Sequence, residues 1–246
     1  FHVTGVQTCA LPISCDWPSY TNAPPATTTV GATPRTKVHR VPEKAVSDTQ
    51  RVHDILDAGL VAHVACVVDG QPFVVPVGYA RDGDRVLFHG SAASRLFKTL
   101  AAGQPTCFEV TLLDGLVLAR SAFESSMNYR SVMALGTCVE LEGQEKLDAL
   151  LRITDHLLPG RSADARPTSP QEAKATTVLA LSLAECSCKV SDKMPEDDPA
   201  DLVDEVYSGI WAGVVPMREV FDAPLADPQA TSRGAAVPGY VTTWRR

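Results

Sequence analysis

Three Asp-Gly dipeptides interrupt stretches that are rich in β-branched residues, at Asp69-Gly70, Asp82-Gly83 and Asp114-Gly115. Asp-Gly accepts the positive backbone φ of a two-residue turn, so a chain with this pattern folds back on itself repeatedly. We therefore expect three antiparallel hairpins. The paired strands would be Val61–Val68 with Phe73–Ala80, Phe73–Ala80 with Val86–His89, and Thr106–Leu113 with Leu116–Phe123.

The remaining pattern adds three strands and three helices. We expect strands over Tyr129–Leu141, bent near Gly136, and over Thr177–Leu183 and Cys186–Val190. Helices are expected from the cap Ser47 or Asp48 to Gly59, from Ser94 to Gly103, and over Gln144–Leu158, whose leucines recur on one face. Tight hairpins with few helices favour a mainly β fold, an antiparallel split barrel, over a doubly wound parallel sheet.

The two ends of the chain differ from the middle. Residues 1–34 carry one charge, Asp16, and five prolines, and Val3–Ile13 looks like a translated sequencing adapter. Such a segment buries too little surface to offset its ordering entropy. We expect 1–34 to be disordered or artefactual, 35–228 to form one domain, and 229–246 to be an unstructured tail. No Lys or Arg precedes Arg35, so a secretory leader is not expected.

Composition excludes several classes of protein. With 45% hydrophobic and 21% charged residues the chain is typical of globular proteins, and it has no apolar run of membrane-spanning length. A net charge of −7 argues against a nucleic-acid partner. The seven cysteines are irregularly spaced, and Cys186-Ser187-Cys188 lacks the further ligands of a zinc site, so we expect no metal and a cytoplasmic location.

Three segments carry residues that suit a flat anionic ligand. Val74–Tyr79 places Pro76 and Gly78 inside a strand, which indicates either an ordinary edge strand or close approach by a ligand. In Leu87–Arg95 a strand ends at His89 and a small-residue turn leads to a helix. That helix start is either a plain cap at Ser94 or a phosphate site completed by Arg95.

The third segment, Met127–Gly136, brings Arg130 into an apolar strand. Burying a guanidinium is costly unless an anion meets it. Arg130 is therefore solvated at the strand mouth, paired with a carboxylate such as Glu124, or directed at a ligand.

The order of these segments resembles the pyridoxamine 5′-phosphate oxidase-like, FMN-binding split-barrel superfamily, nearest its flavin-nucleotide-binding and nitroimidazole-resistance subgroup. The resemblance runs from about Arg35 to Asp227. It rests on VVPVGYARDGDRVLFHGSAASR, LLDGLVLARSAF, SMNYRSVMALG and the late tetrad Ile210-Trp211-Ala212-Gly213.

The resemblance implies a homodimer with FMN at the subunit interface and a small-molecule substrate. His89 would face the substrate as the catalytic group, unless it is a strand-end histidine bonded to a carbonyl. The implied cofactor-binding residues are Val75, Pro76, Val77, Tyr79, His89, Gly90, Ser91, Ser94, Arg95, Tyr129, Arg130, Ser131 and Trp211.

The activity expected from the resemblance is that of an FMN-dependent oxidoreductase, with NAD(P)H as electron donor and a nitro or quinone-like compound as acceptor. Leu96 and Ser131 stand where true vitamin B6 oxidases carry Lys and Gln, so that reaction is not expected. Two alternatives remain open: a non-catalytic flavin carrier, and a haem-handling member of the superfamily in which a histidine ligates iron.

Overall fold

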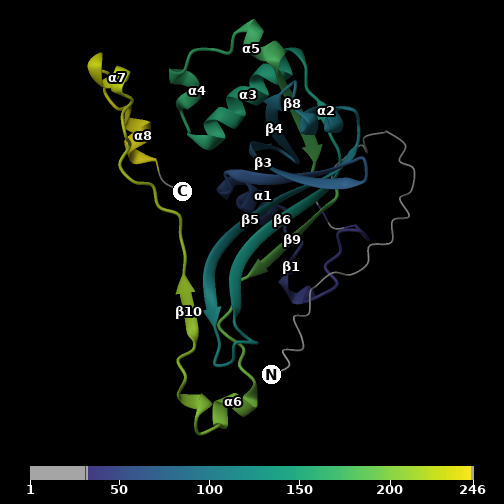
Figure 1. Cartoon of the computed structure of the whole chain (residues 1–246), viewed down its shortest axis with the longest axis vertical. Coiled ribbons are helices and arrows are strands. Elements are labelled where there is room, and N and C mark those ends of the chain that lie inside the picture. Colours follow the sequence, from purple (N-terminus) through teal and green to yellow (C-terminus); the bar gives the residue numbers. More distant parts are fainter. Residues whose placement is uncertain (1–30, 32, 245–246) are drawn as a thin grey trace.

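The computed structural model describes residue 31 and residues 33–244 and has one large antiparallel sheet (Figure 1). Most of the segment 1–34 therefore lies outside the described residues. The strands pair in the order β1-β9-β6-β5-β2-β3-β4-β8-β7, with β10 added to β5. Their bounds are β1 Ala45–Val46, β2 Val61–Val68, β3 Gln71–Asp82, β4 Arg85–Ser91, β5 Pro105–Leu118, β6 Ser126–Thr137, β7 Val139–Glu140, β8 Thr176–Ser182, β9 Cys186–Ser191 and β10 Gly213–Pro216.

The sheet curls without closing. β6 ends at Thr137 and β7 begins at Val139, yet β6 pairs with β9 while β7 pairs with β8, near opposite ends of the strand order. One residue, Cys138, joins them, so the two ends of the sheet must come round toward each other. Gly136, with φ of 159°, supplies the bend that was expected there. The mainly β, split-barrel prediction is confirmed.

Two of the three expected hairpins form. Asp69 and Gly70 both have positive φ and join Val68 to Gln71 in register, as an Asp-Gly turn requires. The second turn joins β3 to β4, and its two-residue loop is Gly83-Asp84, one residue later than expected.

The third hairpin prediction is wrong. β5 runs straight through Asp114-Gly115 to Leu118, with only a bulge between Leu113 and Gly115. β10 lies against this stretch, and a Cβ on Gly115 would stand 3.0 Å from the carbonyl oxygen of Val215. Gly115 therefore allows the backbones of β5 and β10 to approach closely. The chain turns only after Leu118, where β5 ends, to reach β6.

Helices pack on both faces of the sheet, α1 and α2 on the inner side and α3 on the outer side. Their bounds are α1 Thr49–Ala58, α2 Arg95–Ala101, α3 Gly143–Leu157, α4 Arg161–Asp164, α5 Pro170–Ala175, α6 Pro199–Val203, α7 Pro228–Ser232 and α8 Gly239–Thr243. Asp48 caps α1 by accepting a hydrogen bond from the Arg51 backbone N–H. Among the helices of the described residues, none has the length and apolar character that crossing a bilayer requires.

Two clusters of buried side chains hold the fold together. The main cluster fills the inside of the curled sheet and includes residues of α1 and α2. The second lies under α3, on the outer side of β3, β4 and β8. α3 buries Ala149 and Ile153 there, whereas Leu151 and Leu157, which we expected on its packed face, are exposed. The sheet contacts the side of α3 that carries Ala149 and Ile153, whereas Leu151 and Leu157 lie at other positions around the helix.

The strands β5 and β6 curve out of the body, flanked by β9 and β10, toward α6 (Figure 1). We call residues 111–118, 126–131 and β10 the arm. Beyond β10 the chain returns past the body, and the Tyr240 hydroxyl of α8 donates to Asp164 of α4 over 2.7 Å. We expected 229–246 to be unstructured, but its described part contains α8 and the end of α7.

Candidate functional site

The outer face of the sheet is uncovered beside α3. Register places Pro76 of β3 opposite His63 of β2, and His63 opposite Glu109 of β5. Cross-strand partners share a face, so these side chains form one row. Three valines of the same face, Val61, Val67 and Val74, are 50–62% exposed. The single chain therefore presents a broad apolar surface with a few polar groups set into it.

Alternation divides the predicted residues of β3. Pro76 points to the outer face, whereas Val75, Val77 and Tyr79 point inward. Val77 is buried, and Tyr79 is fully buried with its hydroxyl donating to the Leu56 carbonyl oxygen over 2.5 Å. Val77 and Tyr79 belong to the core, and Val75 lies at its exposed rim, so Pro76 is the residue of the four that faces the open surface.

His63 and Glu109 were missed by the sequence analysis. His63 Nδ1 lies 3.8 Å from a carboxylate oxygen of Glu109, and the other oxygen of Glu109 accepts a hydrogen bond from Thr111. The only signal for His63 was a polar residue at an outward position of an otherwise apolar strand. Glu109 offered no local signal, because its role depends on the register between β2 and β5.

The turn between β4 and α2 is compact. Ser91 Oγ accepts from the Ala93 N–H over 3.2 Å, and the Ser91 carbonyl oxygen accepts from the Ser94 N–H over 2.9 Å. Ser94 stands at the N-cap, but its side chain makes no capping hydrogen bond. A Cβ on Gly90 would lie 2.1 Å from the Phe97 ring, so this position requires glycine.

Arg95 follows this turn with its guanidinium exposed. It stacks on the Phe73 ring, 3.9 Å from the centroid, and makes no ion pair with any described residue. Stacking holds a guanidinium in place without neutralising its charge. Arg95 is thus an oriented, unmatched cation beside a turn.

His89 lies on the outer side of β4, since its neighbour Phe88 points into the core. Its side chain reaches solvent, but the surrounding protein desolvates the ring and lowers the pKa of His89. The imidazole is therefore neutral at pH 7, which suits a hydrogen bond or metal ligation better than proton donation. No hydrogen bond among the described residues joins it to a carbonyl.

Arg130 is neutralised by the fold itself. It donates two hydrogen bonds of 2.7 Å to the carboxylate of Asp114, and these bonds raise the pKa of the Arg130 guanidinium. The partner is Asp114, not Glu124. Arg130 also points to the face opposite Tyr129 and Ser131, because neighbouring residues of a strand alternate. It does not offer an unmatched charge to a ligand.

Trp211 is 64% exposed between η2 (Tyr207–Gly209) and β10, with its ring over Gly213. Within the described chain, no hydrogen bond or ion pair links it or the Tyr129–Ser131 segment to the β4–α2 turn. The single chain thus holds the predicted site as separate pieces: the turn, the outer face, and the arm.

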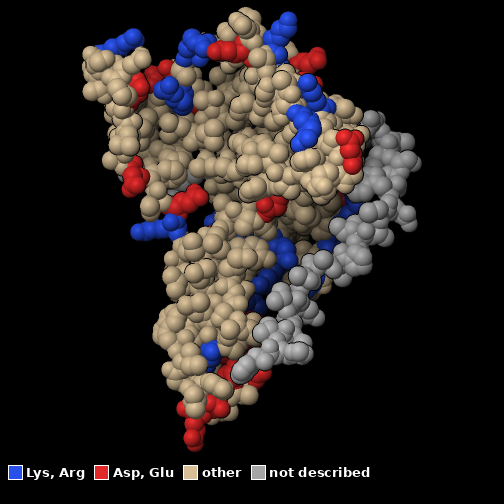
Figure 2. All heavy atoms as spheres, in the orientation of Figure 1, with Lys and Arg blue, Asp and Glu red and all other residues tan. Residues whose placement is uncertain are grey.

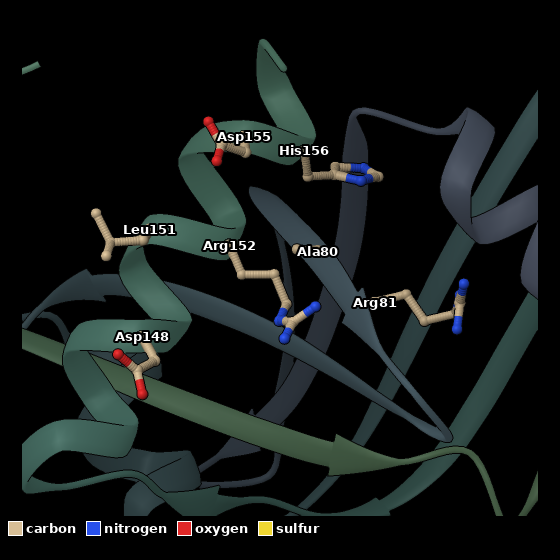
Figure 3. Close-up of a pocket in the computed structure, with 7 residues that line it drawn as sticks. All are labelled: Ala80, Arg81, Asp148, Leu151, Arg152, Asp155 and His156. Atoms are coloured by element: carbon tan, nitrogen blue, oxygen red, sulfur yellow. The ribbon is translucent and has the colours of Figure 1, made fainter. Parts of the chain in front are cut away.

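A cavity of about 430 Å³ lies elsewhere, between α3 and β3 (Figure 3). Its charged groups already have partners: Arg81 binds Asp57, and Arg152 lies 3.3 Å from Asp82. In Figure 3 the carboxylates of Asp148 and Asp155 point away from β3. None of the predicted site residues lines this cavity, so it is not the candidate site.

Known proteins are similar to this chain over most of its length. The family model described as pyridoxamine 5′-phosphate oxidase matches residues 48–190. The chain is 42% identical to the flavocytochrome Anf3 from Azotobacter vinelandii, covering 87% of this chain and 99% of that one, with a TM-score of 0.80. It is 39% identical to the FAD and heme binding protein from Mycobacterium smegmatis, covering 80% and 95%, with a TM-score of 0.76.

A more distant likeness concerns the fold alone. A putative 5-nitroimidazole antibiotic resistance protein from Bacteroides thetaiotaomicron is 23% identical, covers 59% of this chain and 86% of its own, and has a TM-score of 0.51. No curated protein matches the chain in sequence.

Proposed function

This chain belongs to the pyridoxamine 5′-phosphate oxidase family, and from that premise we propose that it is a flavin-dependent redox protein acting on a small molecule. The observation that carries the proposal is the β4–α2 turn. Arg95 is a cation held by Phe73 without a carboxylate partner among the described residues, and the neighbouring Ser94 hydroxyl makes no capping bond. These groups fit the phosphate of a flavin nucleotide.

The rest of the site fits a flat ring. Pro76 and Val74 give the outer face a shallow apolar surface without large side chains between them. A bound flavin supplies the electron chemistry, and the chain binds it, orients it and shields it from water. His89 would meet the substrate as a neutral imidazole.

The name of one similar structure, the FAD and heme binding protein, favours FAD over the FMN expected from the sequence. One relative is called an FAD and heme binding protein and the other a flavocytochrome. We therefore propose FAD as the flavin. FMN remains the competing prediction.

The same names favour haem as a second cofactor. The desolvated, neutral ring of His89 is in the form that ligates iron, and His63 lies on the same outer face. We propose that one of these two histidines holds a haem. Haem would supply one-electron chemistry, and this role competes with a substrate-facing role for His89.

We also propose a homodimer with flavin at the interface. Burying the exposed valines of the outer face against a second copy would remove a continuous apolar surface from water. A dimer would also bring the separate pieces of the site together from two subunits. A mass equal to one chain in light scattering after gel filtration would contradict this.

The absorption spectrum of the purified protein tests the cofactors. We expect flavin bands together with a Soret band, and chromatography of the released flavin should identify FAD. A colourless protein that binds neither added FAD nor added FMN would overturn the proposal. Anaerobic bleaching by NAD(P)H separates an enzyme from a non-catalytic carrier, since a carrier has no reason to accept hydride at a useful rate.

A further inference from the structure

Three lysines of this chain, Lys146 of α3 among them, are half-buried. Two of the three, Lys44 and Lys189, lie at the same border of the sheet, around the pairing of β1 with β9. Neither makes an ion pair with a described residue. Half-burial holds the aliphatic stem of a lysine against the protein while its ammonium can still reach solvent. Two such ammonium groups at one place, without carboxylate partners among the described residues, attract an anion that arrives with a ligand.

The two lysines converge on one place. Lys189 of β9 is in register with Ser131 of β6, and Ala45, which follows Lys44, is in register with Lys189 from the other side. The Lys44 ammonium lies 5.9 Å from the centroid of the Tyr129 ring, two residues before Ser131. We call Lys44, Tyr129, Ser131 and Lys189 the lysine patch.

Basic side chains gather on this side of the molecule (Figure 2). In Figure 2 Lys and Arg atoms gather in the recess between the body and the arm, over the part where Figure 1 shows β9 and β1. Glu196 lies close enough for Lys44 to contribute to the lowered pKa of its carboxyl, but Lys193 is the larger cause and binds Glu196 directly. The carboxylate of Glu196 is thus already paired with another lysine.

We infer that the lysine patch binds the diphosphate of FAD, with the two ammonium groups and the Ser131 hydroxyl as donors to phosphate oxygens. This inference rests on the proposed flavin function and deepens it. FMN has one terminal phosphate, which the β4–α2 turn suits, whereas a dinucleotide carries a second phosphate that needs its own cations.

The turn and the patch lie on different sides of the sheet, since α2 packs into the inner cluster and Ser131 faces outward. We therefore expect the turn of one subunit and the patch of the other to serve one dinucleotide. In that arrangement the patch sets the preference between FAD and FMN.

The test compares the affinity of the flavin-free protein for FAD and for FMN by flavin fluorescence. The double variant Lys44→Gln/Lys189→Gln should bind FAD at least tenfold more weakly and FMN within twofold of the unaltered protein. The control Lys37→Gln/Lys174→Gln removes the same charge from exposed positions and should change neither. Lys44→Arg/Lys189→Arg should largely restore FAD binding. A thermal melt checks that each variant is folded.

Two outcomes would overturn the assignment. FAD affinity that is unchanged, or that falls equally with FMN affinity, would show that the patch does not recognise the second phosphate. Slower reduction by NADPH with unchanged FAD affinity would indicate that the patch binds the diphosphate of NADPH and not that of FAD. Failure of the proposed function looks different, because the unaltered protein would then bind neither flavin.

Discussion

The β4–α2 turn and the arm each carry an arginine that the sequence assigned to the same ligand, and the two are in opposite electrostatic states. Arg130 in the arm is bound through two hydrogen bonds to Asp114, a neighbour on the adjacent strand. Arg95 at the turn rests on an aromatic ring and has no carboxylate partner among the described residues. A guanidinium matched by its own fold stabilises the strand pair, whereas an unmatched one is available to an anion from outside.

Replacing the unmatched arginine should have the largest effect. Arg95→Ala should weaken flavin binding by about 10- to 100-fold, because a charge-assisted contact to phosphate is lost. Arg130→Ala should leave the flavin dissociation constant within about threefold. Both constants can be measured by fluorescence titration. Equal losses in the two variants would remove the distinction between the regions.

The shape of the turn can be disturbed without touching its charge. Gly90→Ala places a methyl group 2.1 Å from the Phe97 ring, so the turn must shift, at a cost of about 1–3 kcal/mol in unfolding free energy. Flavin affinity should fall with it because Arg95 is displaced. Adding Phe97→Leu should recover part of the lost unfolding free energy, measured by urea denaturation. It should also recover part of the lost flavin affinity, measured by fluorescence titration. No recovery would mean that the strain lies elsewhere.

Removing the carboxylate in the arm should convert its arginine to the unmatched state. Asp114→Asn should lower the unfolding free energy by about 1 kcal/mol or less, since both side chains are partly exposed and solvent screens the pair. Flavin affinity should not change, because Arg130 points away from the face of Tyr129 and Ser131. A tighter complex in this variant would show that Arg130 does reach the ligand.

The smallest effect concerns pH. The pKa of His89 is lowered in the folded chain, so the unfolded chain binds more protons at mildly acidic pH. Stability from this group is complete above the unfolded pKa, near 6.5, and declines as the pH falls below it. Denaturation at pH 7.5 and pH 5.5 should therefore show a smaller loss for His89→Gln than for the unaltered protein. An identical loss would mean that His89 is not desolvated.

The elements that the sequence predicts well depend on local chemistry. Asp69-Gly70 forms its hairpin because both residues accept positive φ whatever surrounds them. Asp114-Gly115 has the same letters but lies where β10 adds a third strand, and this non-local pairing converts the expected turn into a bulge. The residues on either side of Asp114 in the sequence give no sign of the pairing between β5 and β10.

The sequence indicates which residue types the site contains better than it indicates where their side chains point. Strict alternation along β3 sends the side chains of Val77 and Tyr79 inward with the core and leaves Pro76 outside, so this part of the geometry could be predicted from the sequence. The pairing of Arg130 with Asp114, the row from Pro76 to Glu109 and the position of Lys189 beside Ser131 all depend on strand register. Register is set by the whole sheet and is not visible in one segment.

The strands at both ends of the sheet order, β1 and β7, are two residues long. Each of these border strands therefore offers a passing chain only two residues on which to continue the sheet. Encounters between copies are thereby directed to the broad faces rather than the borders. A protein that leaves valines open to water in this way favours discrete, finite assemblies and disfavours fibrils.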